Sequence, residues 1–223
     1  MTRSRAPALV KPTQANDAPA PRRRGRPRDP ARLARILEVA QEQFLEHGLE
    51  GTSLDRIAQA ADTTRVTIYS YFGSKEALFN ATMCEPIREQ VVVGIDTLDP
   101  AQPRDALLSF ATGYLKLILD DKLIAHTRIL YASSGRDPAL GRAFYVAGPQ
   151  SVENGLANYL SRAHTLGTLR TPEPAIAAEQ FLSMVRGNEQ IRVLMGRPAA
   201  RAAKARRAYL ESSVNVFLKA YAV

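Results

Sequence analysis

The chain has 223 residues, of which 45% are apolar and 23% charged, with a formal net charge of +8. This length allows one large domain or a small domain beside a larger one, and the single cysteine, Cys84, excludes an intrachain disulfide. No apolar run approaches the roughly 20 residues of a membrane span, and the amino terminus lacks a secretory signal, so we expect a cytoplasmic protein. An inert, half-buried thiol at Cys84 is a better interpretation than a redox sensor.

Most of the positive charge lies in residues 1–29, which hold eight basic and two acidic residues. The segment is rich in Pro, Ala and Arg and poor in large apolar residues, so we expect a disordered basic arm. Within it, Arg-Gly-Arg-Pro at 24–27 resembles the core of an AT-hook. Glycine lets the backbone approach a narrow minor groove, and Arg24 and Arg26 favour its negative potential. The alternative is a basic tail that contacts phosphates without reading sequence.

The next stretch predicts an amphipathic helix. Asp29 can cap it and Pro30 fits its first turn, while Gly48 marks its end. Its apolar residues recur at helical spacing and are Leu33, Ile36, Leu37, Ala40 and Phe44. This stripe should cover a helical hairpin and complete a three-helix domain over residues 30–90.

The hairpin is a predicted helix-turn-helix at residues 53–72. Thr52 or Ser53 can cap its first helix, and Thr63 or Thr64 its second, which begins at Arg65. Asp62 lies at the break, where a residue that tolerates left-handed dihedrals is required. A helical hairpin whose polar face is merely hydrated remains the alternative.

The outward side chains of this hairpin suit duplex DNA. Arg65 can bond a guanine edge, Thr67 can meet a base or a thymine methyl, and tyrosine hydroxyls can bond phosphates. Lys75 opposes the dipole at the start of the next helix, which a nearby phosphate would explain. The candidate DNA-binding residues are Arg24, Arg26, Thr52, Ser53, Thr64, Arg65, Val66, Thr67, Tyr69, Tyr71 and Lys75.

Residues 30 to 80 resemble the amino-terminal domain of the TetR family of bacterial regulators. The run Val-Thr-Ile-Tyr-Ser-Tyr-Phe-Gly-Ser-Lys-Glu-Ala-Leu-Phe at 66–79 is close to that family's signature, and Gly48 and Thr52 fall at the expected spacing. The family often has glycine at position 62 and an apolar residue at 63, where this chain has Asp62 and Thr63. The resemblance implies a contact between Lys75 and DNA phosphate, and a helix after residue 74 that carries a signal between two domains.

The remaining chain, residues 91–223, is expected to form a larger helical domain, so the fold class is all-α. Pro86 should kink or end the helix that begins at Ser74, near Glu85. Later helices are predicted to start at Pro103, Asp137–Pro138 and Thr171–Pro172, with breaks at Gly148–Pro149 and at Gly196–Pro198.

The resemblance also implies a homodimer joined through the last two helices and a pocket for an unidentified small-molecule effector between about residues 103 and 195. A two-fold dimer would match a palindromic operator in double-stranded DNA. The candidate pocket residues are Phe110, Tyr114, His126, Tyr131, Phe144, Tyr145, Met184, Asn188 and Arg192.

No phosphate loop, Cys-x-x-Cys pair, His-x-x-x-His pair or nucleophile elbow is present in the sequence, so we expect no enzyme activity, cofactor or metal site. The function we expect is a ligand-responsive repressor, nucleoid-associated when bound to DNA. Two other classes stay open: an architectural DNA binder that uses the basic arm, and a helical protein-interaction module. Activation instead of repression stays open as well.

Overall fold

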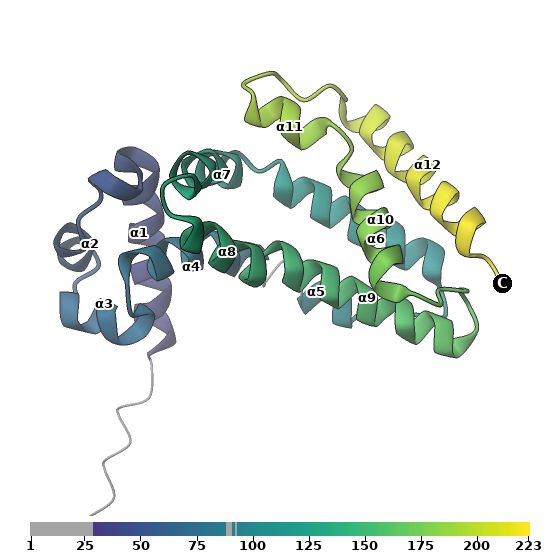
Figure 1. The fold of residues 1–223 in the computed structure, drawn as a ribbon, viewed down its shortest axis with the longest axis horizontal. Helices are drawn as coiled ribbons and strands as arrows, with labels where there is room; N and C mark the ends of the chain where they lie inside the picture. Colours follow the sequence, from purple (N-terminus) through teal and green to yellow (C-terminus); the bar gives the residue numbers. More distant parts are fainter. Residues whose placement is uncertain (1–28, 88–90, 92) are drawn as a thin grey trace, which may run out of the picture.

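The computed structural model describes residues 29–223 except 88–90 and 92, and the regular elements in these ranges are helices. The prediction of an all-α fold is therefore confirmed. Figure 1 shows the first four helices gathered at one end of the molecule. They are α1 (Pro30–Gly51), α2 (Leu54–Ala60), α3 (Arg65–Phe72) and α4 (Lys75–Ile87). The predicted basic arm, including Arg24 and Arg26, lies outside the described residues.

Helix α1 begins and breaks where its sequence predicts. Asp29 caps it by accepting from the backbone N–H of Ala31 at 3.1 Å, and Pro30 occupies the first turn. Gly48 interrupts the helix with φ 69°, a left-handed value that favours glycine, and one further turn follows. The stripe that α1 buries consists of Ile36, Val39, Ala40 and Phe44.

Helix α4 joins the two parts of the molecule. It packs on α1, where the rings of Phe44 and Phe79 meet edge to face at 5.1 Å between centroids. Phe79 also lies 5.9 Å from the ring of His126, which belongs to the following region. The helix is described as far as Ile87 and includes Pro86, and residues 88–90 lie outside the described ranges, so the kink or end predicted near Glu85 stays a prediction.

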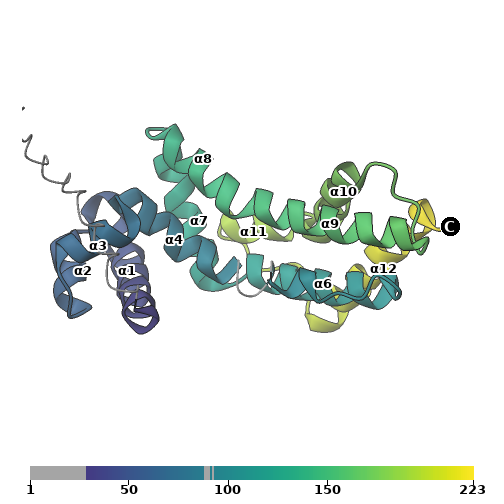
Figure 2. The ribbon, with the colours of Figure 1, turned by 90° about the horizontal axis from the view of Figure 1, so that it is seen from below.

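The larger region consists of α5 to α12, in which α8 and α9 follow one another from the first four helices toward the far end (Figures 1 and 2). α9 packs on α10, and α12 packs on both α6 and α10. The bounds are α5 (Val93–Asp96), α6 (Pro103–Ile118), α7 (Asp121–Ser134), α8 (Pro138–Ala147), α9 (Pro149–Leu166), α10 (Pro174–Arg186), α11 (Glu189–Leu194) and α12 (Ala203–Tyr221).

One predicted helix start is wrong. The helix predicted from Thr171–Pro172 begins instead at Pro174, because Thr171 is fully buried and its hydroxyl donates to the carbonyl of Leu160 at 3.0 Å. The same helix also divides at Gly187, where φ is 47°, into α10 and α11. The breaks predicted at Gly148 and Gly196 are both confirmed.

Candidate nucleic-acid interface and ligand cavity

The helix-turn-helix at 53–72 is built by local hydrogen bonds. The Ser53 hydroxyl accepts from the N–H of Asp55 and caps α2, while the Thr64 hydroxyl accepts from the N–H of Thr67 at 3.1 Å and caps α3. Asp62 lies between them with φ 48° and is the non-glycine residue with positive φ in the described part of the chain. These contacts confirm the predicted turn and fix the direction of α3.

The exposed side of α3, here called the α3 face, presents Arg65, Val66 and Tyr69. Val66 is 78% exposed and Tyr69 is 42% exposed, although both are large apolar side chains. The Arg65 guanidinium donates to the Asp55 carboxylate at 3.2 Å and to the Tyr69 hydroxyl at 3.3 Å. The hydrogen bond with Tyr69 and the charge of Asp55 raise the pKa of Arg65 above its ordinary value. The cation is therefore held in place on an exposed surface.

Three other candidate residues are turned toward the protein. Thr52 is 4% exposed, and its hydroxyl donates to the carbonyl of Gly48 at 2.6 Å. Lys75 donates to the Thr52 carbonyl at 3.3 Å, so the structure supplies a protein acceptor for this cation. The Tyr71 hydroxyl accepts from the N–H of Asp29 at 3.1 Å, which ties the start of α1 to α3. Thr52 and Tyr71 thus position the helices against one another, whereas Lys75 is only partly buried.

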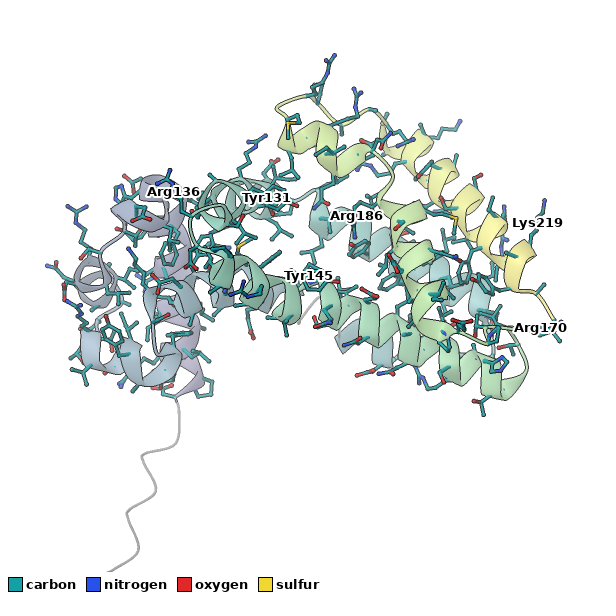
Figure 3. The ribbon with its side chains drawn as sticks, in the orientation of Figure 1. Tyr131, Arg136, Tyr145, Arg170, Arg186 and Lys219 are labelled. Atoms are coloured by element: carbon teal, nitrogen blue, oxygen red, sulfur yellow. The ribbon has the colours of Figure 1, made fainter. Side chains whose placement is uncertain are left out.

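A central cavity of about 380 Å³ lies between the helices of the larger region. Figure 3 shows Tyr131, Tyr145 and Arg186 around this central part of the molecule, each from a different helix. Its walls are mainly apolar and aromatic, with a few charged groups, which is the usual character of a small-molecule site. The lining residues are Ile87, Tyr114, Leu117, Ile118, Leu123, Thr127, Tyr131, Phe144, Tyr145, Pro149, Val152, Glu153, Glu179, Leu182, Ser183, Arg186 and Gln190.

The structure brings four of the predicted pocket residues into this cavity and leaves five outside it. Those in the lining are Tyr114, Tyr131, Phe144 and Tyr145. Those outside it are Phe110, His126, Met184, Asn188 and Arg192. Phe110 belongs to the packed core and stacks on Tyr114, and His126 is buried against Phe79. Met184 faces the groove between α10 and α12, and Asn188 is exposed at the start of α11.

The sequence reasoning missed the charged members of the cavity. Arg186 ends α10, and its Nη2 donates to the Tyr114 hydroxyl at 3.2 Å. Its signal in the sequence is a cation four residues after Leu182, on the apolar stripe of α10 and directly before Gly187. Glu179 lies on the same face of α10, seven residues before Arg186, and it too was not among the predicted pocket residues.

The cavity touches the elements that support the helix-turn-helix. Ile87 of α4 forms part of its wall, as do Tyr131 of α7 and Tyr145 of α8. α8 packs on α4, and α7 packs on α1. A molecule in the cavity would therefore contact the helices on which the first domain rests.

Three further observations on the described residues concern the cysteine, metal binding and membrane spans. Burial raises the pKa of the Cys84 thiol to about 12, which supports an inert thiol. Across the described ranges 29–87, 91 and 93–223, acidic, His and Cys side chains form no group able to hold a metal. The same ranges contain no helix with the length and apolar character needed to cross a bilayer.

Comparison with known proteins gives matches along both parts of the chain. Residues 36–82 match the family model "Bacterial regulatory proteins, tetR family", and residues 105–223 match "AefR-like transcriptional repressor, C-terminal domain". An HTH-type transcriptional repressor of Streptomyces coelicolor is 34% identical over 93 residues, which are 41% of this chain and 48% of that protein. The chain thus spans about half the length of this relative.

Two solved structures are similar to this chain over nearly their whole length. The flavonoid-responsive regulator FrrA is 33% identical with a TM-score of 0.68, and the match covers 87% of this chain and 98% of FrrA. A TetR-family transcriptional regulator from Mesorhizobium loti is similar in fold, with a TM-score of 0.75, 22% identity and the same coverage.

Proposed function

This chain belongs to the TetR family of DNA-binding transcriptional regulators, and we propose that it is a homodimeric repressor released from a palindromic operator by a small-molecule effector. The observation that carries the proposal is the pairing of an exposed α3 face with a cavity whose wall includes the end of α4. The α3 face and the part of the cavity wall that α4 supplies thus belong to the same small amino-terminal domain.

The α3 face supports reading of the major groove. Arg65 offers guanidinium donors to guanine, and the exposed methyls of Val66 suit the thymine methyl group. Tyr69 offers a hydroxyl to phosphate. We assign base contacts to Arg65, Val66 and Thr67, phosphate contacts to Ser53, Thr64, Tyr69 and Lys75, and positioning of the helices to Thr52 and Tyr71. Arg24 and Arg26 are proposed to contact the adjacent minor groove.

The surface of α10 and α12 supports the homodimer. Ile176 and Val216 are 46% and 55% exposed, and both line a groove between these helices together with Met184. Exposed apolar side chains that gather on two neighbouring helices are typical of a face that a second protein surface covers. A second copy of the chain, related by a two-fold axis, fits a palindromic site.

The effector would act by stabilising one of two arrangements of the domains. In the proposed mechanism the free dimer holds its two α3 helices at the operator spacing. A ligand among α4, α7 and α8 favours a different arrangement, and the operator affinity falls only as far as the ligand prefers that arrangement. FrrA is flavonoid-responsive by name, which supports a small organic effector for this chain.

Selection of bound genomic fragments by the purified protein tests the function. Full-length chain and a chain lacking residues 1–28 would be compared at about 150 mM salt, where loose phosphate binding is suppressed. We expect one short palindrome with both proteins. Fragments without a common motif, lost when residues 1–28 are removed, would instead identify an architectural DNA binder. Absence of salt-dependent DNA binding would identify a protein-interaction module.

A further inference from the structure

Arg186 is a cation without a counter-charge at the wall of the central cavity. Its side chain makes one hydrogen bond, to the Tyr114 hydroxyl, and its Nε is buried without an acceptor. Among residues 29–87, 91 and 93–223, no carboxylate lies within ion-pair distance of it. Arg186 is half-buried, and a buried donor such as its Nε is unfavourable unless another group accepts from it.

Tyr114 directs a second donor to the same place. Its hydroxyl oxygen accepts from Arg186, and none of the hydrogen bonds in the described part of the chain uses the hydroxyl proton. A tyrosine hydroxyl can accept and donate at once, so this proton is available to a ligand. The Thr127 hydroxyl, in contrast, already donates to the carbonyl of Leu123 at 2.7 Å. The donors of Arg186 and Tyr114 therefore require an acceptor, and an anionic oxygen satisfies both.

The rest of the wall selects an aromatic body. Tyr131, Phe144 and Tyr145 contribute rings from α7 and α8, and α4, α6, α7, α9 and α10 contribute aliphatic side chains. Flat rings can stack on such side chains at favourable offsets. The volume of about 380 Å³ lies at the small end of ordinary ligand sites, which extend from about 300 to 1,000 Å³. A ligand of one to three rings fits this space.

The acidic residues of the cavity make its two ends different in charge. Glu179 precedes Arg186 by seven residues on α10, so the two side chains leave the helix about 10 Å apart along its axis. Glu153 reaches the cavity from α9, and the ion pairs among the described residues include none between Glu153 and Arg186. An anionic group is therefore favoured at the Arg186 end and disfavoured at the Glu179 end.

We propose that the central cavity binds an aromatic compound with an anionic oxygen, a carboxylate or phenolate. This oxygen pairs with Arg186 and accepts a hydrogen bond from the Tyr114 hydroxyl. This inference rests on the proposed effector-binding function and gives the chemical class of the effector. Arg186 acts as the residue that distinguishes an anion from a neutral molecule of the same shape.

Calorimetry with matched probes on the full-length protein tests the inference. The probes are cinnamate, 4-hydroxycinnamate, 2-naphthoate and biphenyl-4-carboxylate, each beside its neutral amide, with decanoate as an aliphatic acid. We expect at least one aromatic acid to bind about tenfold or more tightly than its amide, because hydrogen bonds to charged groups are the stronger ones. Decanoate is expected to bind more weakly than that acid.

Substitutions identify the residue responsible. Arg186→Gln is expected to weaken the preferred acid about 10- to 100-fold and to remove its advantage over the amide. Arg186→Lys keeps the charge and should restore part of the affinity, and Tyr114→Phe should weaken the acid with Arg186 intact. Arg170→Gln makes the same chemical change at an exposed site away from the cavity and should leave binding unchanged (Figure 3). Thermal unfolding of each variant checks that it is folded.

Several results would overturn the inference. These are equal binding of acids and amides, binding of none of the aromatic acids, or an acid preference that survives Arg186→Gln. The proposed function is judged separately by operator binding without any probe. A palindrome bound without probe but released by a neutral compound would keep the function and reject the anionic class. If the protein prefers acids through Arg186 but binds no palindrome, the anionic class is kept and the proposed function is rejected.

Discussion

The helix-turn-helix and the central cavity are assembled in opposite ways. The side chains of the α3 face come from consecutive turns of one short helix, and caps from neighbours within a few residues hold that helix in place. The cavity takes its wall from seven helices between Ile87 and Gln190, and no two neighbouring helices supply it alone. The α3 face can therefore be specified locally, whereas the cavity depends on the packing of the whole domain.

The two regions nevertheless meet at one group of rings, Phe44, Phe79 and His126, which is called the seam below. Phe79 of α4 lies between Phe44 of α1 and His126 of α7, and both Phe44 and Phe79 are fully buried. α7 also packs directly on α1. The independence of the two regions is thus limited by this group of rings, and a change there should affect both.

Removing the ring at the seam is expected to have the largest effect. Phe79→Ala should lower the free energy of unfolding by about 3–5 kcal/mol, because it removes a fully buried ring and leaves a cavity. Hydrogen exchange followed by mass spectrometry should show faster exchange in both α1 and α7.

Phe217→Ala is the matched control for the seam. Phe217 is 1% exposed and packs on Phe181 at 4.9 Å, within the larger region alone. We expect a similar loss of stability with faster exchange confined to the later helices. If Phe79→Ala accelerated hydrogen exchange in only one of α1 and α7, the two regions would be separate folding units.

The second prediction concerns the α3 face. Arg65→Ala should weaken operator binding by about 1–3 kcal/mol, roughly 5- to 150-fold, and relax the base preference at one position of each half-site. Fluorescence anisotropy with a set of single-base operator variants measures both. Arg207→Ala removes an exposed arginine that pairs with Glu211 on α12 and should change neither. Unaltered base preference in Arg65→Ala would mean that this arginine contacts phosphate instead.

The sequence predicts the helix-turn-helix well because its determinants are local. The left-handed Asp62 is found where the sequence places it, and the caps at Ser53 and Thr64 are each one of the two adjacent residues that the sequence offers. The direction of the Thr52 side chain was not predictable in the same way. Its hydroxyl bonds the carbonyls of Gln43 and Gly48, which are brought to it by the break in α1.

The cavity was only partly predictable. Helical periodicity indicates that a side chain faces inward, but it does not say whether packed neighbours or empty space lie opposite. Tyr114 and Phe110 lie on one face of α6 and stack on each other, yet only Tyr114 lines the cavity. Arg186 was overlooked because a charged residue near a helix end usually reaches solvent. Only the packing of α6 against α10 makes it part of a wall.

A smaller effect is expected at the cap of α3. Thr64→Ala should destabilise the chain by about 1 kcal/mol, because the N–H of Thr67 loses its acceptor. Thr63→Ala is the neighbouring control, since no hydrogen bond among the described residues uses the Thr63 side chain, and a change below about 0.5 kcal/mol is expected. Urea unfolding distinguishes the two. Equal losses in both variants would show that the cap does not determine the stability of α3.

The smallest expected effect is a dependence of stability on pH at the seam. Burial lowers the pKa of His126 below its ordinary value of 6.5, against an opposing bond from its Nδ1 to the Lys122 carbonyl, and its Nε2 has no partner. Lys116, Lys122 and Asp120 are the charged groups of the small hollow that His126 lines, while α1 and α4 contribute the neutral side chains of Gln41 and Thr82. Because the unfolded chain binds the proton more readily, stability is complete above the unfolded pKa and falls as the pH drops through it.

Between pH 7 and pH 6 this loss should stay below about 0.7 kcal/mol, the limit for one histidine with an unfolded pKa near 6.5 that stays neutral when folded. Urea unfolding at the two pH values measures it. His126→Leu should abolish the difference, whereas His47→Gln leaves the seam intact and should retain it. A difference that persists in His126→Leu would place the titrating group elsewhere. The seam would then join the two regions through apolar packing alone, with no sensitivity to protons.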